Sequence, residues 1–145
     1  MSWPDGAVGV VELPDGRRVR GRGLRDPVPL GPRPTFGVYL LNRPPQPFEW
    51  DYRWIKWRDF ATPTDPREAI DVLRDAYTRA QTERVEIACA GGTGRTGTAI
   101  ALLAVFAGIR PETAVAWVRT HYRRRAVETP WQRRWIASVG IGTQR

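Results

Sequence analysis

The segment from residue 84 to residue 107 constrains the fold of this chain more than any other part. Residues 84–88 alternate β-branched and other side chains, which predicts a short strand. A tight turn follows, permitted by Gly91, Gly92 and Gly94. Residues 95–107 are mostly apolar and predict a helix that Gly108 ends. In such a turn the backbone N–H groups point inward beside a helix N-terminus, so the turn forms a cradle for an anion.

The rest of the chain shows strand patterns before the cradle and helix patterns on both sides of it. The expected strands are residues 8–13, 17–24, 36–41 and 52–57, with a hairpin turn at 14–16 and loops at 26–34 and 42–47. The expected helices run from Pro66 to about residue 80, from Pro111 to about residue 123, and from Pro130 to about residue 138. Thr64 or Asp65 caps the first of them.

These patterns predict one α/β domain over residues 1–145, with a central, mostly parallel sheet flanked by helices. The chain is 41% hydrophobic, which is typical of a folded globular protein. Residues 1–10 do not resemble a signal peptide, and the apolar stretch at 99–109 is too short to span a bilayer. We therefore expect a cytoplasmic protein with no membrane association.

The formal charge of +8 suggests an anionic partner. A nucleic-acid-binding protein, however, usually shows a basic stripe interleaved with exposed aromatic residues. Here the 23 basic residues are scattered along the chain, and all except Lys56 are arginines. A nucleic acid is therefore not the expected partner.

Cys89, the only cysteine, lies at the entrance of the predicted cradle. A single cysteine excludes an internal disulfide and disfavours a cysteine-based metal site. Helix N-termini and neighbouring arginines favour a thiolate, which is the nucleophilic form of cysteine. Arg95 offers a planar fork that matches two phosphate oxygens at once. A buried structural cysteine is the alternative interpretation.

Cys89, five intervening residues, Arg95 and Thr96 together resemble the signature loop of the protein-tyrosine and dual-specificity phosphatases. The resemblance implies a protein-tyrosine-phosphatase-like fold and a phosphocysteine intermediate on Cys89. It implies that Thr96 assists departure of the sulfur and that neither a cofactor nor a metal is required. The residues that it implies for the phosphate loop are Ala90, Gly91, Gly92, Thr93, Gly94 and Arg95.

The resemblance also implies an aspartate that protonates the leaving group, on a loop upstream of the cysteine. Trp57-Arg58-Asp59 follows an expected strand and resembles that loop with Arg58 in place of proline, so Asp59 is the expected acid and Asp65 the reserve. Trp3-Pro4-Asp5 matches the family tripeptide literally, but it precedes every expected strand, so we interpret it as a decoy.

The family uses a glutamine in a C-terminal loop to hold the hydrolytic water. Residues 127–132 resemble that loop, and Gln132 is the matching residue. The expected substrate is phosphotyrosine or another phosphorylated residue of a protein, or a small phosphomonoester, and the choice between phosphotyrosine and phosphoserine or phosphothreonine stays open. The loop has no basic residue before Arg95, which ranks phosphoinositides low. Oligomeric state stays open.

Four features call for an alternative interpretation to be considered. Residues 92–97 match G-x-G-x-x-G, but no strand follows the helix as a dinucleotide site requires. Ala88 stands where the family usually has histidine, which together with Arg58 keeps a non-catalytic phosphate- or phosphopeptide-binding module open. His121 is expected on a helix surface. Four aromatic residues fit either a substrate wall or the core, namely Tyr52, Trp54, Trp57 and Phe60.

Overall fold

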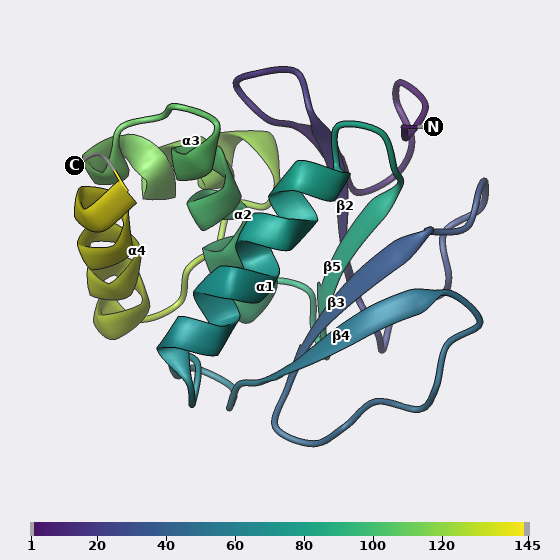
Figure 1. The fold of residues 1–145 in the computed structure, drawn as a ribbon, viewed down its shortest axis with the longest axis horizontal. Coiled ribbons are helices and arrows are strands. Elements are labelled where there is room, and N and C mark those ends of the chain that lie inside the picture. Colours follow the sequence, from purple (N-terminus) through teal and green to yellow (C-terminus); the bar gives the residue numbers. More distant parts are fainter. Residues whose placement is uncertain (1, 144–145) are drawn as a thin grey trace.

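The computed structural model describes residues 2–143 and contains one five-stranded sheet with helices packed against it (Figure 1). The strands are β1 (Val10–Glu12), β2 (Arg18–Gly23), β3 (Phe36–Leu41), β4 (Asp51–Lys56) and β5 (Val85–Cys89). Their order across the sheet is β1-β2-β5-β3-β4. The pairs β2–β5, β5–β3 and β3–β4 are parallel, and β1 joins β2 as an antiparallel edge strand. The expected α/β fold with a mostly parallel sheet is confirmed.

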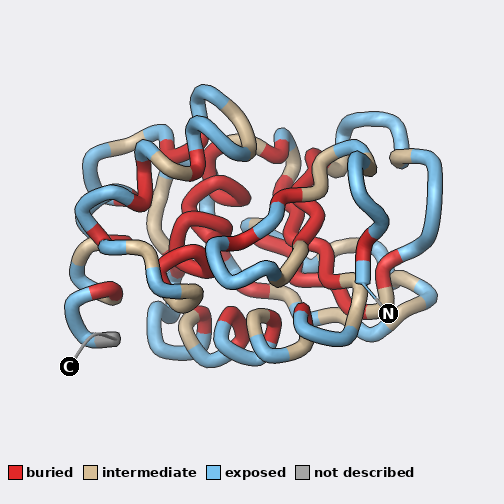
Figure 2. The backbone as a smooth tube through the Cα atoms, turned by 90° about the horizontal axis from the view of Figure 1, so that it is seen from above, coloured by how far each residue is buried: buried red, intermediate tan, exposed pale blue. Residues whose placement is uncertain are grey.

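The helices are α1 (Pro66–Arg79), α2 (Gly94–Phe106), the short 3-10 helix η1 (Pro111–Thr113), α3 (Ala114–His121) and α4 (Pro130–Thr143). Every residue of α2 up to Val105 is buried, because α2 lies between the sheet and the other helices. Figure 2 shows this buried stretch at the centre of the molecule, enclosed by exposed loops and helix turns. The hydrophobic core therefore surrounds the helix that begins at the phosphate loop.

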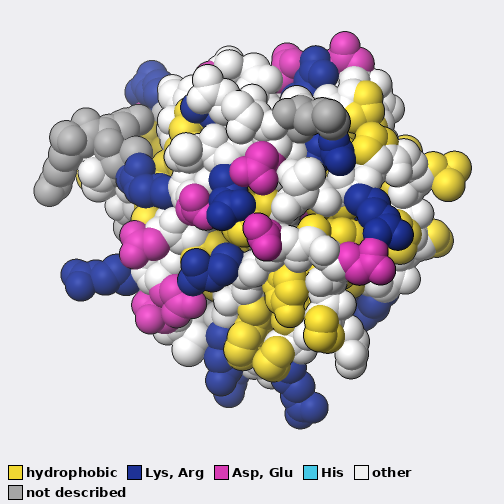
Figure 3. All heavy atoms as spheres, turned by 45° about the vertical axis from the view of Figure 1, so that its right-hand side comes forward, with side chains coloured by type: hydrophobic (Ala, Val, Ile, Leu, Met, Phe, Trp, Pro, Cys, Tyr) yellow, Lys and Arg dark blue, Asp and Glu magenta, His cyan; other side chains and the backbone are white. Residues whose placement is uncertain are grey.

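The other face of the sheet carries a buried ionic cluster. Glu86 Oε1 accepts hydrogen bonds from Arg20 Nη2 over 2.6 Å and from Arg22 Nε over 2.7 Å, and Glu86 Oε2 accepts one from the Tyr39 hydroxyl over 2.7 Å. The Arg20 guanidinium also stacks on the ring of Trp3. Figure 3 shows the right-hand side of the molecule, where apolar side chains gather among charged ones. The charges of Glu86, Arg20 and Arg22 are tolerated in a buried position because they are paired with one another.

Several element boundaries differ from the expectation. The strand expected over residues 8–13 is shorter, Val10–Glu12, and β2, β4, β5 and α2 differ by one residue at both ends. The helix expected from Pro111 begins with a 3-10 turn and ends at His121, two residues before the expected end. The last helix continues to residue 143 instead of about residue 138, although Gly140 lies within it. A Cβ atom at Gly140 would lie 2.4 Å from Pro111 Cγ, so close packing between α4 and η1 outweighs the low helix propensity of glycine.

All four parallel strands end at the same edge of the sheet, which lies at the bottom in Figure 1. Ligands of open α/β sheets bind outside this carboxyl edge. Cys89 ends β5, a central strand, and Asp59 lies in the loop that connects β4 to α1. The topology therefore brings together segments that are 30 residues apart in the sequence, counted from 59 to 89.

Candidate active site

The sulfur of Cys89 is held at the mouth of the turn between β5 and α2. It accepts a hydrogen bond from the Gly92 N–H over 3.1 Å and another from the Thr96 hydroxyl over 3.0 Å. The residue is 2% exposed. Both donors are directed at the sulfur, so they fix its position at the start of the turn. The structure thus places the Thr96 hydroxyl in contact with the Cys89 sulfur.

The turn is supported from outside by the residues that follow α3. The Tyr122 hydroxyl donates to the Gly92 carbonyl, and Arg123 Nη1 donates to the Gly91 carbonyl over 2.9 Å and to Thr93 Oγ1 over 3.1 Å. Burial raises the pKa of Tyr122, so its hydroxyl remains a donor at neutral pH. These contacts hold the carbonyl groups of the loop away from the cradle and leave its amides for an anion.

Gly92 is required by its surroundings. Its φ is +76°, a conformation that other residues rarely adopt, and a Cβ atom there would lie 2.3 Å from the Gly23 nitrogen. The loop passes this close because the chain after β2 runs alongside it, with the Leu24 N–H bonded to the Cys89 carbonyl over 2.9 Å. Strand β2 therefore supports one side of the phosphate loop.

Arg95 is buried with one donor unpartnered. The side chain is 5% exposed, and its Nη1 donates to the Trp57 carbonyl over 3.0 Å. Its Nε has no hydrogen-bond partner among residues 2–143 and lies 3.6 Å from Asp59 Oδ1, too far for a hydrogen bond. An orphaned buried donor needs an explanation, and a phosphate oxygen in the cradle would satisfy it.

Asp59 lies on the acid loop, defined here as residues 57–61. Its side chain is 53% exposed, and Oδ1 accepts a hydrogen bond from the Phe60 N–H over 3.1 Å. Phe60 adopts a φ of +63°, which is strained for an aromatic residue. The structure therefore brings Asp59 to Arg95 and leaves its carboxyl open to solvent and substrate.

Gln132 is fully buried, and its amide joins two loops. Oε1 accepts hydrogen bonds from the N–H groups of Glu128 over 2.8 Å and Thr129 over 3.2 Å. Nε2 donates to the Ala61 carbonyl over 3.0 Å. Neighbouring Trp131 donates from Nε1 to the Phe60 carbonyl. These bonds fasten the acid loop to the segment 127–132, and in this arrangement the Gln132 amide has backbone partners at both ends.

Glu128 is a residue that sequence reasoning missed. A Cβ atom on Gly94 would lie 1.8 Å from Glu128 Oε1, so this carboxylate rests on the first residue of α2. Burial raises the pKa of Glu128, the negative charge of Asp59 raises it further, and the positive charge of Arg95 opposes both. Val127, which precedes it, has a φ of +65°, an outlier for a β-branched residue. The sequence signal was its place in the segment 127–132, which resembles the family's water-positioning loop but was used only to select Gln132.

The two other candidate aspartates lie elsewhere. Trp3 donates from Nε1 to the carbonyl of Val85, at the opposite end of β5 from Cys89, and Asp5 pairs with Arg18. Asp65 caps α1 by accepting a hydrogen bond from the Glu68 N–H over 3.2 Å. Neither carboxylate is joined to the phosphate loop by an ion pair.

The expected aromatic wall divides into core and surface. Trp57 is fully buried and packs edge-on against Trp135, while Trp54 donates to the Leu41 carbonyl. Tyr52 belongs to an aromatic group with Tyr39 and Phe48. Only Phe60 among the four is exposed, at 53%. His121 is also exposed, stacked on Trp117 at the end of α3.

The comparisons with known proteins identify the class. A family model for protein-tyrosine phosphatase matches residues 40–137, more than half of the chain and the whole stretch from the acid loop to Gln132. The chain therefore belongs to the protein-tyrosine phosphatase family, and we describe it as an enzyme of the protein-tyrosine and dual-specificity type. No match was found among the curated proteins.

Solved structures show the same fold. Tk-PTP in its active form is similar with a TM-score of 0.71 and 22% identity, over 92% of this chain and 97% of that one. DUSP15 is similar with a TM-score of 0.58 and 13% identity, over 76% of this chain and 72% of that one. Kinase associated phosphatase (KAP), with its catalytic cysteine substituted by serine, is similar with a TM-score of 0.57 and 20% identity, over 66% of this chain and 55% of that one.

Two further findings concern residues 2–143. They contain no helix long and apolar enough to cross a membrane. They also contain no cluster of three or more His, Cys, Asp or Glu side chains with the geometry of a metal site. The candidate site is thus built from a thiol, one guanidinium, backbone amides and two carboxylates.

Proposed function

We propose that this protein hydrolyses phosphomonoesters through a phosphocysteine intermediate on Cys89, with phosphotyrosine in proteins as the substrate. The observation that carries the proposal is the Cys89 sulfur beside the cradle, with two hydrogen-bond donors on it. The unpartnered Nε of Arg95 supports the same conclusion, since it offers a donor that a phosphate oxygen would accept.

In the first step the Cys89 thiolate attacks phosphorus from the side opposite the leaving oxygen. The sulfur–phosphorus bond forms as the phosphorus–oxygen bond breaks, and Asp59 gives its proton to the departing oxygen. The amides of residues 90–95 and the Arg95 guanidinium hold the other three oxygens as their charge redistributes. This step needs Asp59 in its acid form, and its carboxyl lies exposed beside Arg95.

In the second step a water attacks the phosphocysteine. Asp59 accepts a proton from the water, the oxygen bonds to phosphorus, and the sulfur leaves as thiolate with the Thr96 hydroxyl donating to it. Sequence reasoning assigned the water to Gln132. We propose that Glu128 accepts a hydrogen bond from the water's other O–H, whose proton stays on the oxygen, and that Gln132 positions both loops, because the Gln132 amide already has backbone partners.

An aromatic ester is favoured over an alkyl ester by the surface beside Asp59. Phe60 and Trp131 are exposed at 53% and 48%, and the Trp131 indole N–H bonds to the Phe60 carbonyl. The two side chains therefore lie at the same rim of the site. Aromatic pairs contribute about 0.5–1.5 kcal/mol beyond simple burial, so they offer a phosphotyrosine ring a contact that phosphoserine lacks.

Hydrolysis of para-nitrophenyl phosphate from about pH 5 to pH 8, with a chelator present, tests the proposal. The wild type should turn over, Cys89→Ser should be inactive, and Asp59→Asn should lose most of the activity. Phosphotyrosine should be preferred to phosphoserine in otherwise identical peptides. An inert wild type that still binds vanadate would reject hydrolysis in favour of the phosphate-binding module.

A further inference from the structure

The hollow beside the phosphate loop has a volume of about 560 Å³, which is larger than a phosphate group alone would fill. Arg95, Asp59 and Ala90 are among the residues that line it. Three further arginines line its rim, namely Arg25, Arg43 and Arg58. Asp59 is the only carboxylate among the described lining residues, so the rim is strongly positive around the reactive position.

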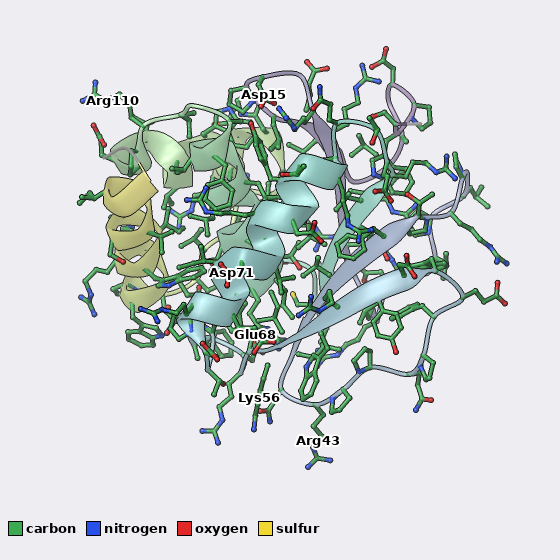
Figure 4. All side chains as sticks on the ribbon, viewed as in Figure 1. Asp15, Arg43, Lys56, Glu68, Asp71 and Arg110 are labelled. Carbon is green, nitrogen blue, oxygen red and sulfur yellow. The ribbon has the colours of Figure 1, made fainter. Side chains whose placement is uncertain are left out.

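The three arginines occupy equivalent places in the fold. Arg25 follows the end of β2, Arg43 the end of β3 and Arg58 the end of β4, each as the second residue after the strand. Because these strands are parallel and Cys89 ends β5 between them, the arginines lie on both sides of the nucleophile at one edge of the sheet. Figure 4 shows Arg43 projecting from this edge, at the bottom of the view.

No structural role occupies these guanidinium groups. All three residues are exposed, and within residues 2–143 none of the three side chains forms a hydrogen bond, an ion pair or a ring contact. Arginines that support the fold are paired, as Arg119 is with the carbonyls of Ala126 and Val127. The backbones of two of them are engaged: the Arg25 N–H donates to the Ala90 carbonyl over 3.1 Å, and the Arg58 carbonyl accepts from the Ala61 N–H over 3.1 Å. The first of these bonds fixes the Arg25 main chain beside the phosphate loop and leaves its side chain free.

We propose that these three residues form an anion subsite, the arginine rim, that selects phosphopeptides with acidic residues on both sides of the phosphorylated residue. The span of the rim favours a peptide over a compact polyphosphate. From β2 to β4 there are three strand spacings, which amount to about 14 Å, the length of roughly four residues of extended chain. Arg25 would contact one flank of the peptide, and Arg43 and Arg58 the other.

This inference rests on the proposed function and names its substrate class. The phosphate loop has no basic residue before Arg95, so the loop alone predicts no preference for additional negative charge on the substrate. The three arginines add such a preference. The positive charge reaches the site from three separate loops after β2, β3 and β4. We therefore expect these arginines to contact the acidic residues beside the phosphorylated residue, while the phosphate group itself is bound by the phosphate loop.

The test uses two phosphotyrosyl peptides with the same length, one flanked by Asp and Glu and one by Asn and Gln. We expect the wild type to prefer the acidic peptide by about tenfold in kcat/KM, as three exposed ion pairs allow. In a variant with Arg25→Gln, Arg43→Gln and Arg58→Gln the ratio should fall to near one. Arg110→Gln is the matched control, since Arg110 is exposed at the far corner of Figure 4 and should keep the ratio.

The outcomes separate this inference from the proposed function. If the wild type hydrolyses neither peptide nor para-nitrophenyl phosphate, the proposed function fails. If it hydrolyses both peptides equally well, the arginine rim is wrong and the proposed function stands. Faster hydrolysis of an inositol polyphosphate than of the acidic peptide would also overturn the rim as a peptide subsite. The acidic preference should weaken as salt is raised, because these charges are exposed.

Discussion

Gln132 and Ala61 are joined by a 3.0 Å hydrogen bond from the Gln132 side-chain nitrogen to the Ala61 carbonyl, across 71 residues of sequence. The oxygen of the same amide accepts from Glu128 and Thr129. One buried side chain therefore fastens the loop of the expected acid to the loop of the second carboxylate. The geometry of Asp59 relative to Glu128 depends on this connection.

Replacing Gln132 by leucine should therefore destabilise the protein and disturb both loops. The substitution leaves buried backbone groups without partners, at a cost of about 1–3 kcal/mol. Urea unfolding should show this loss, and kcat should fall because Asp59 and Glu128 lose their common support. Gln132→Glu keeps an acceptor for Glu128 and Thr129 but loses the donor to the Ala61 carbonyl, so kcat should fall there as well. Equal stability of wild type and Gln132→Leu would contradict the structural role.

Glu128→Gln should slow breakdown of the phosphoenzyme more than its formation. A hydrogen bond to a charged acceptor is worth about 1.5–3 kcal/mol, which corresponds to roughly a ten- to hundredfold loss in kcat. Rapid mixing with para-nitrophenyl phosphate should then show a burst of product followed by a slow phase. Glu112→Gln is the control, since Glu112 lies in η1, away from the phosphate loop. A slow first phase without a burst would assign Glu128 to the first step.

The same variant should alter stability in a pH-dependent way. Burial and the Asp59 charge raise the pKa of Glu128 above its usual 4.5, so the folded protein binds this proton more tightly than the unfolded chain does. Protonated Glu128 therefore contributes its full stabilisation at pH values below 4.5, the pKa in the unfolded chain. This stabilisation is lost as the pH rises through the higher pKa of the folded protein. Glu128→Gln should thus match wild type at about pH 3 and exceed it slightly at about pH 7, by roughly a few tenths of a kcal/mol because solvent screens an exposed group. Chemical unfolding at both pH values measures this.

Thr96→Val tests the hydrogen bond to the nucleophile. Valine keeps the shape of threonine but removes the hydroxyl that donates to the Cys89 sulfur over 3.0 Å. The sulfur becomes a poorer leaving group, and kcat should fall by about ten- to a hundredfold as phosphoenzyme accumulates. Thr96→Ser should restore most of the rate. Thr120→Val, on the exposed face of α3, serves as the control.

Glu86→Gln tests the buried cluster behind the sheet. The change removes the charge that pairs with Arg20 and Arg22, which are 3% and 8% exposed in their side chains. Breaking a buried ion pair by changing one partner costs about 3–5 kcal/mol, because the remaining charges are uncompensated. Urea unfolding should therefore show a much larger loss than in Glu112→Gln. A loss within about 0.5 kcal/mol would show that the cluster is accessible to water.

The phosphate loop could be predicted from the sequence because its parts are contiguous. Cys89, the glycines and Arg95 lie within one strand–turn–helix unit, where local periodicity and glycine positions determine the geometry. Asp59 could be placed near it because its loop follows a recognisable strand. Trp3-Pro4-Asp5 matches the family tripeptide but was rejected as the acid loop by the same reasoning, since no expected strand precedes it.

The remaining site features depend on packing between distant segments. Glu128 reaches Gly94 only because Val127 adopts a strained backbone conformation, which no local pattern encodes. The arginine rim depends on strand order, and β5 enters between β2 and β3 although it is last in sequence. The extension of α4 likewise involves a distant contact, since Gly140 packs against Pro111 of η1.

The most direct test of the central claim is detection of phosphate on Cys89 itself. Glu128→Gln enzyme, mixed with para-nitrophenyl phosphate and quenched in acid within the burst, should gain the mass of one phosphoryl group. Peptide mapping should locate that group on Cys89, and Cys89→Ser treated in the same way should show no turnover. Product release with no phosphoryl group on Cys89 at any time, or a group on another residue, would contradict the account.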